Sequence, residues 1–197
     1  DEIVAELTDL VDRHWGQRDP ATLLPFLKTP SALQGFIALV RARASAGAPI
    51  AVLHLDLDNF KSINTIGYEV GNDVLREFTE RFRSAFSGLG VPVRTGGDEL
   101  SAILYGGTIA QILQATDAFR RRMHEEPFAA INRPNTCSIG LCLYPISERF
   151  LGVTSEKVIL RDAIAAAERA KVEGRNRVVL SGPIKPVAAT DTISSQD

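Results

Sequence analysis

Two pairs of acidic residues stand where a folded chain could bring them together. Asp56 and Asp58 close an otherwise apolar run over 50–57, and Asp98 and Glu99 follow two consecutive glycines. Carboxylates at a strand end and at a hairpin tip converge if the two strands are neighbours in one sheet. Convergent oxygen ligands suit Mg²⁺, which binds through a few carboxylates together with substrate phosphates. The acidic residues therefore predict a metal-dependent site.

A pair of basic residues, Lys171 and Arg175, lies near the end of the last helical pattern in the chain. A spacing of four residues on a helix places two side chains on one face, where both can hold phosphates. Together with the acidic pairs, this predicts a site for a nucleoside triphosphate, with charge neutralised at the phosphates. Ordinary strand-end and helix-end charges are the alternative, and that alternative would be preferred for any one of these residues alone.

Periodic patterns predict the elements that must position these residues. Apolar residues at helical spacing predict helices, and short apolar runs between turn residues predict strands. A hairpin is predicted at residues 95–98 because glycine tolerates a positive φ. A polar loop is expected after residue 58. The predicted helices cover 31–46, 72 or 73 to 86, 108–125 and 155–172, and the predicted strands cover 50–57, 91–94, 100–105, 136–144 and 177–180.

The two ends of the chain are expected to lie outside the main domain. Residues 1–18 predict a signalling helix with a coiled-coil-like seam, or equally an amphipathic helix docked on its own domain. Residues 19–180 form the predicted domain. Residues 181–197 are rich in Pro, Ala, Thr and Ser and predict a flexible tail or linker.

Composition limits the class of protein. The 197 residues suit one globular domain, and a formal net charge of −2 argues against nucleic-acid binding by charge alone. No apolar run is long enough to span a bilayer, so a cytoplasmic location is expected. Cys137 and Cys142 lie at an odd spacing within one predicted strand, which places them on opposite faces and argues against a disulfide.

Four runs of the sequence resemble the GGDEF family of diguanylate cyclases. They are LDLDNFKSIN at 55–64, RTGGDEL at 94–100, TCSIGLCLYP at 136–145 and AKVEGRNRVV at 170–179. The resemblance covers roughly 19–180 and implies an α+β, palm-like nucleotide cyclase fold with a central mixed β-sheet flanked by helices. It implies a homodimer in which each domain binds one GTP. Each 3′-hydroxyl then attacks the other α-phosphate, giving cyclic di-GMP and pyrophosphate with Mg²⁺ or Mn²⁺.

The resemblance also assigns roles to individual residues. It implies metal binding by Asp56, by the carbonyl of Leu57 and by Asp98. It implies catalytic roles for Asp98, Glu99 and Lys61. The substrate contacts that it implies are Phe60, Asn64, Asn72, Gly96, Gly97, Lys171 and Arg175.

This sequence departs from the family pattern in the loop that would read guanine. The chain runs from Asn64 to Gly67-Tyr68 with one residue fewer than usual and with Tyr in place of His. Asn72 stands where the family has an aspartate, unless a shift in register brings in Asp73. A neutral amide accepts hydrogen bonds from guanine more weakly than a carboxylate does. Weaker base discrimination is therefore expected.

The residues leave several functions open. An active diguanylate cyclase is the preferred hypothesis. A degenerate GGDEF module that binds GTP or a partner without turnover is the main alternative, and a cyclase that also accepts adenine is a third. The helical N-terminal segment and the tail suggest further sensor or phosphodiesterase domains in the full-length protein.

Overall fold

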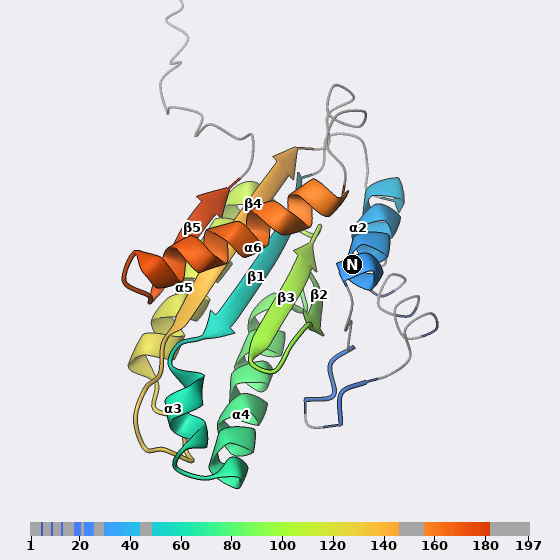
Figure 1. The fold of residues 1–197 in the computed structure, drawn as a ribbon. Coiled ribbons are helices and arrows are strands. Elements are labelled where there is room, and N and C mark those ends of the chain that lie inside the picture. Colours follow the sequence, from blue (N-terminus) through green and yellow to red (C-terminus); the bar gives the residue numbers. More distant parts are fainter. Residues whose placement is uncertain are drawn as a thin grey trace, which may run out of the picture.

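The computed structural model describes residues 30–43, 49–145 and 156–181, together with positions 5, 9, 13, 18–20 and 22–25. Helices and strands are interspersed along the chain (Figure 1). The helices are α2 (Pro30–Arg43), α3 (Phe60–Asn64), α4 (Tyr68–Phe86), α5 (Ile109–Glu125) and α6 (Glu156–Val172). The strands are β1 (Pro49–Leu57), β2 (Gly90–Arg94), β3 (Glu99–Leu104), β4 (Cys137–Pro145) and β5 (Arg177–Ser181).

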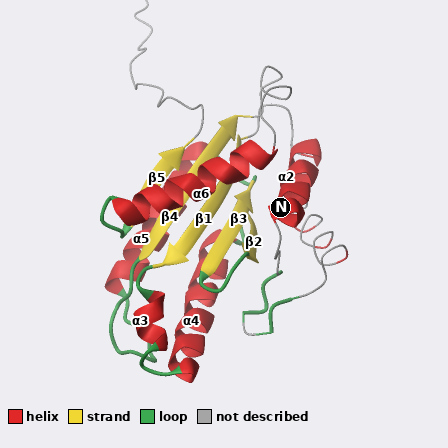
Figure 2. Cartoon of the chain, in the orientation of Figure 1, coloured by secondary structure: helices red, strands yellow, loops and turns green. Residues whose placement is uncertain are grey.

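The strands form one mixed sheet in the order β2-β3-β1-β4-β5. β1 pairs antiparallel with both β3 and β4, and β2 pairs antiparallel with β3. β4 and β5 are parallel. Helices flank the sheet, with α6 lying across the strands in the view of Figure 2. The α+β fold with a mixed sheet is confirmed, and β1 at the centre explains why its residues are apolar on both faces.

The two faces of the sheet carry separate hydrophobic clusters. Leu53 and Leu55 of β1 pack in the cluster with α4 and α5. The alternate residue Val52 packs with α2 and α6. Cys137 and Cys142 are both free and lie in different clusters, so their predicted placement on opposite faces is confirmed. A strand that is buried on both faces holds its carboxyl end in a fixed position.

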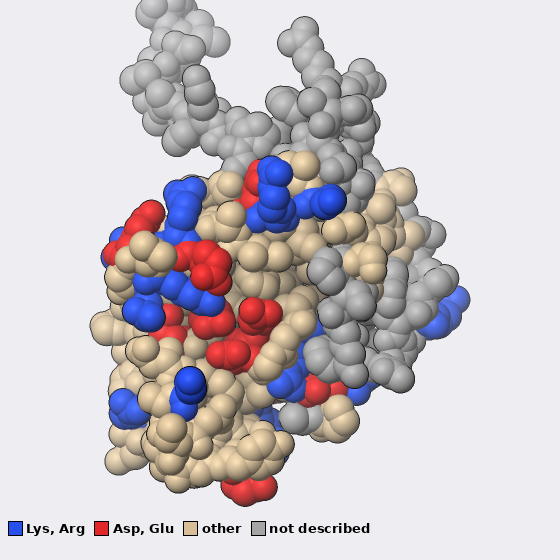
Figure 3. All heavy atoms as spheres, viewed as in Figure 1, with Lys and Arg blue, Asp and Glu red and all other residues tan. Residues whose placement is uncertain are grey.

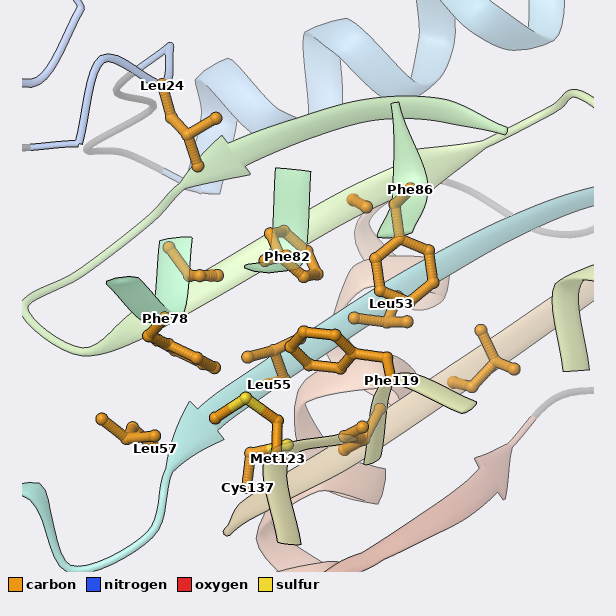
Figure 4. Close-up of a cluster of buried hydrophobic side chains, with 14 of the residues drawn as sticks. Leu24, Leu53, Leu55, Leu57, Phe78, Phe82, Phe86, Phe119, Met123 and Cys137 are labelled. Atoms are coloured by element: carbon orange, nitrogen blue, oxygen red, sulfur yellow. The ribbon is translucent and has the colours of Figure 1, made fainter. Parts of the chain in front are cut away.

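Aromatic rings join α4 to α5 beneath the sheet (Figure 4). The ring centroid of Phe119 lies 5.7 Å from that of Phe82 and 5.5 Å from that of Phe86. Both contacts are edge-on, the arrangement that the ring quadrupoles favour. The aromatic face of α4 is therefore its core face.

Two local predictions around the first acidic residues were wrong. The polar loop after β1 contains the short helix α3, which Ile63 anchors in the core. The next helix begins at Tyr68, one turn before the predicted start, because Gly71 is buried and Val70 packs against the core in the first turn. Its N-cap, Gly67, makes no side-chain cap, so no capping residue marks the helix start in the sequence.

The predicted end segments lie mostly outside the described residues. Positions 5, 9 and 13 are helical, and Arg13 forms an ion pair with Asp9. Most of the rest of the helical segment predicted within residues 1–18 is outside the described residues. β5 extends to Ser181, one residue into the predicted tail, and residues 182–197 are not described. None of the described helices has the length and hydrophobicity that crossing a bilayer requires.

Gly140 of β4 is required by the close approach of α6. A Cβ atom there would lie 2.1 Å from the carbonyl oxygen of Ala163 and 2.4 Å from the backbone nitrogen of Ala167. These are backbone atoms, so α6 must move away from the sheet. Gly140→Ala is expected to lower the free energy of unfolding by about 2 kcal/mol or more, measured by urea denaturation.

Gly88→Ala is the matched control, since a Cβ there meets no atom within 4 Å. Equal stability of the two variants would contradict the close packing of α6 on β4.

Candidate active site

An acidic cluster forms where β1 and β3 meet. Asp56 at the end of β1 is paired in register with Glu99 at the start of β3, and Asp98 precedes Glu99. Burial, helped by the charges of Asp98 and Glu99 and opposed by Lys171, raises the pKa of Asp56 to about 6. The predicted convergence is confirmed for Asp56, Asp98 and Glu99, and acidic side chains gather on this face (Figure 3). It was wrong for Asp58, which is buried and accepts hydrogen bonds from Thr136 and Ser138.

Lys171, near the end of α6, reaches this cluster. Its Nζ lies 3.1 Å from Oδ2 of Asp56 and 2.8 Å from Oε1 of Glu168. Although burial opposes its charge, hydrogen bonds to these carboxylates raise the pKa of Lys171. The helix thus places one ammonium group beside the acidic cluster.

Arg175 is placed differently from the prediction. Helix α6 ends at Val172, so Arg175 is not on a helical face with Lys171. It lies in the following turn with a left-handed backbone, φ 63°. Its Nε stands 3.9 Å from Oδ1 of the buried Asp58, and the side chain is 49% exposed. The position of the Arg175 guanidinium is therefore determined by a turn and not by helical spacing.

The glycine hairpin between β2 and β3 is confirmed, but not for the reason expected. Neither Gly96 nor Gly97 is among the residues with positive φ. A Cβ on Gly96 would lie 2.5 Å from Oε2 of Glu99, whereas one on Gly97 would meet nothing within 4 Å. The fold itself leaves the space over Gly97 open. Packing within the protein therefore does not require a glycine at position 97. The absence of a side chain there leaves the backbone accessible to a ligand.

A clamp that the sequence did not reveal holds this hairpin. The Arg94 side chain donates to the carbonyl oxygens of Gly96 and Gly97 at 2.9 and 2.6 Å. The same guanidinium lies 2.6 Å from the buried carboxylate of Asp19. Only the fold brings residues 19 and 94 together. The clamp fixes the hairpin to the segment that precedes α2.

The residues assigned to guanine lie around α3 and the first turn of α4. Asn64 places its side chain against the first turn of α4, since a Cβ on Gly71 would lie 1.9 Å from its Oδ1. Asn72 follows directly and is half-buried. Phe60 packs partly against the core, and Lys61 is exposed. Asn64 thus lies beside Gly71, the residue before Asn72, and the contacts of both asparagines with a base remain a prediction.

The donor set of the acidic cluster fits a magnesium ion. Within residues 30–43, 49–145 and 156–181, no group of three or more His, Cys, Asp or Glu side chains is placed to hold a metal alone. Mg²⁺ typically takes one or two carboxylates and completes its shell with phosphates and water. Asp56 already attracts one cation, the ammonium of Lys171. Asp56, Asp98 and the Leu57 carbonyl thus remain the predicted ligands of such an ion.

His54 lies on β1 two residues before Asp56 and is 7% exposed. Its Nδ1 is 2.9 Å from Oγ of Ser101, its neighbour on β3. Burial, reinforced by the charge of Lys171, lowers the pKa of His54 from 6.5 to about 4. The imidazole is therefore neutral in the folded protein at pH 7.

This histidine is expected to make stability depend on pH. The unfolded chain takes up its proton near pH 6.5, and the folded chain does so only near pH 4. Stability from this group is therefore complete above pH 6.5 and is lost as the pH falls toward 4. Asp56, whose folded pKa is raised, titrates in the same window with the opposite sign. The His54 contribution, about 2 kcal/mol between pH 7 and pH 5, is therefore the difference between the wild type and His54→Gln in urea denaturation in metal-free buffer.

His54→Gln should remove the His54 contribution, whereas His124→Gln, at an exposed histidine of α5, should keep it. An equal loss in all three proteins would mean that His54 is protonated in the fold without cost.

Comparison with known proteins gives the chain its relatives. It matches the family described as "Diguanylate cyclase, GGDEF domain" over residues 27–177. It is 31% identical over 143 residues to the response regulator PleD of Caulobacter vibrioides, covering 72% of this chain and 31% of PleD. It is 29% identical over 186 residues to the diguanylate cyclase DosC of Escherichia coli, covering 90% of this chain and 38% of DosC. The chain spans about a third of the length of these curated relatives.

Solved structures agree with this relationship. The active GGEEF domain of a diguanylate cyclase from Vibrio cholerae superposes with a TM-score of 0.61 at 27% identity, covering 74% of this chain and 88% of that one. The GGDEF domain of PA1120 from Pseudomonas aeruginosa gives a TM-score of 0.69 at 26% identity, with coverages of 83% and 94%. The acidic cluster thus lies in a fold shared with these domains, and the chain belongs to the GGDEF diguanylate cyclase domain family.

Proposed function

We propose that this domain is a Mg²⁺-dependent diguanylate cyclase, which condenses two GTP molecules into cyclic di-GMP with loss of pyrophosphate. The observation that carries the proposal is the convergence of Asp56, Asp98 and Glu99 with Lys171 at one edge of the sheet. Carboxylates that repel one another favour binding of a cation between them, and an adjacent ammonium group favours binding of phosphates. A purely structural role does not account for this concentration of charge.

In the proposed reaction, the residues bind and orient one GTP in each domain of a homodimer. Lys171 and Arg175 hold the β- and γ-phosphates, and the open backbone at Gly97 lets the triphosphate approach. An ion held by Asp56, Asp98 and the Leu57 carbonyl would neutralise charge at the phosphates. The 3′-hydroxyl of each nucleotide attacks the α-phosphorus of the other, and the bond to pyrophosphate breaks. Two domains face to face are needed because each supplies one nucleotide.

A non-catalytic GTP-binding module is the second candidate function. The observation that favours it is the shortened loop between α3 and α4, with exposed Tyr68 and half-buried Asn72. A loop that holds the base in a different position would bind GTP without aligning its 3′-hydroxyl.

One incubation separates these functions. The protein is supplied with GTP or ATP and Mg²⁺, and the products are resolved by chromatography. Formation of cyclic di-GMP from GTP supports the cyclase. Metal-dependent GTP binding without product supports the module, and an adenine-containing cyclic product supports the third hypothesis.

Weaker discrimination against ATP is expected because Asn72 replaces an aspartate. A charge-assisted hydrogen bond contributes roughly 1.5–3 kcal/mol and a neutral one about half of that. The difference corresponds to about tenfold in binding preference. Asn72→Asp should therefore raise the ratio of GTP to ATP affinity by about tenfold, measured by competition. An unchanged ratio would mean that Asn72 does not face the base.

A further inference from the structure

Asp58 lies at the junction of β1, β4 and the turn before β5, and it is 1% exposed. Its Oδ1 accepts a hydrogen bond from Ser138 Oγ at 2.7 Å, and its Oδ2 accepts one from Thr136 Oγ1 at 2.6 Å. Oδ2 also accepts the backbone N–H of Asn176 at 3.2 Å. A buried carboxylate with this many donors is held in one orientation.

The contact with Asn176 fixes an unfavourable backbone. Gly174, Arg175 and Asn176 have φ angles of 115°, 63° and 45°. Left-handed conformations at non-glycine residues cost of the order of 1 kcal/mol each and persist only where surrounding contacts impose them. Asp58 supplies such a contact at the third residue of the turn. Without this hydrogen bond, fewer contacts would hold the turn in its left-handed conformation.

The same turn controls both residues assigned to the phosphates. The backbone N–H of Arg175 donates to the carbonyl oxygen of Ala170 at 2.9 Å, which closes the end of α6 next to Lys171. The Arg175 guanidinium stands 3.9 Å from Asp58 and, in the part of the chain that the structure describes, its side chain donates no hydrogen bond. Asp58 therefore orients the Arg175 guanidinium, while the N–H groups of that guanidinium stay available to bind a ligand.

We propose that Asp58 is a positioning residue, which holds the turn over residues 174–176 so that Arg175 is set for the triphosphate beside Lys171. This rests on the proposed function, since it assumes that the two basic residues bind phosphates. Asp58 itself touches no substrate. Its effect should appear in recognition of the β- and γ-phosphates and not in recognition of the base.

The test compares binding of GTP and GMP in the presence of Mg²⁺ by calorimetric titration. Asp58→Asn removes the negative charge that faces Arg175 and replaces one acceptor oxygen with a donor, so the hydroxyl of Ser138 or Thr136 must turn from donating to accepting. We expect the ratio of GTP to GMP affinity to fall about tenfold or more, with GMP affinity unchanged. Glu80→Gln, at an exposed residue of α4 that pairs with Arg83, is the matched control.

A double-mutant cycle separates positioning from stability. If Asp58 acts through Arg175, Asp58→Asn should cause little further loss in an Arg175→Ala background. Thr136→Val removes one donor to Oδ2 and should shift the ratio in the same direction, which keeps the test available if Asp58→Asn fails to fold.

The failures are distinguishable. A ratio that falls in Arg175→Ala but is unchanged in Asp58→Asn and Thr136→Val would overturn the role of Asp58 and leave the proposed function standing. A wild-type protein that binds GTP no better than GMP would overturn the proposed function, and the role of Asp58 with it.

Discussion

Asp98→Ala is expected to abolish formation of cyclic di-GMP, with a fall in rate of about a thousandfold or more. Two carboxylates carry the proposed metal site, and the ion contributes several kcal/mol to stabilising charge in phosphoryl transfer. With one carboxylate removed, the remaining Asp56 would hold the ion far less well. The measurement is product formed from GTP at saturating Mg²⁺.

The fold should survive this substitution. Asp98 lies at a hairpin tip and is half-exposed, so little packing is lost. Its charge raises the pKa of Asp56 in the intact protein, so the pKa of Asp56 should fall in the variant. The melting temperature should stay equal or rise slightly because a repulsion is removed. Glu80→Ala, at an exposed residue of α4 that pairs with Arg83, is the control that should retain turnover. If Asp98→Ala formed product at the wild-type rate, the proposed role of Asp98 would be wrong.

The sheet was accessible from the sequence because its strands are short apolar runs with turn residues between them. The convergence of Asp56 with Asp98 also followed, since it required only that β1 and β3 be neighbours. The predictions that were wrong concern the local structure between β1 and α4. The start of α4 at Gly67 has no side-chain cap, and the helix α3 depends on the burial of Ile63. Neither feature leaves a pattern that periodicity can detect.

Long-range polar contacts could not be predicted from spacing at all. Asp58 was grouped with Asp56 because both end the same strand. The structure instead pairs it with Ser138, 80 positions further along the chain. The link between Asp19 and Arg94 is of the same kind. Such contacts are set by the register of neighbouring strands and by the path of loops, which the composition of either segment does not encode.

Lys171→Met is expected to weaken GTP binding by about tenfold to a hundredfold, measured by titration with Mg²⁺ present. A hydrogen bond to a charged group contributes roughly 1.5–3 kcal/mol, and about 1.4 kcal/mol is tenfold in affinity. Methionine keeps the apolar stem that packs at the end of α6, so the loss reports the ammonium. Lys157→Met, at an exposed position at the opposite end of α6, should bind GTP as the wild type does.

Binding of Mg²⁺ without nucleotide should change in the opposite direction. In the structure the ammonium of Lys171 lies 3.1 Å from Oδ2 of Asp56. A metal ion that binds Asp56 would have to compete with this ammonium group. With methionine there, the ion no longer has to displace a positive charge, and its affinity should rise while GTP affinity falls. This opposition identifies Lys171 as a group that balances the acidic cluster when empty and binds phosphates when filled. If GTP affinity were unchanged while Mg²⁺ affinity rose, Lys171 would serve Asp56 alone, and the triphosphate would be held by other residues.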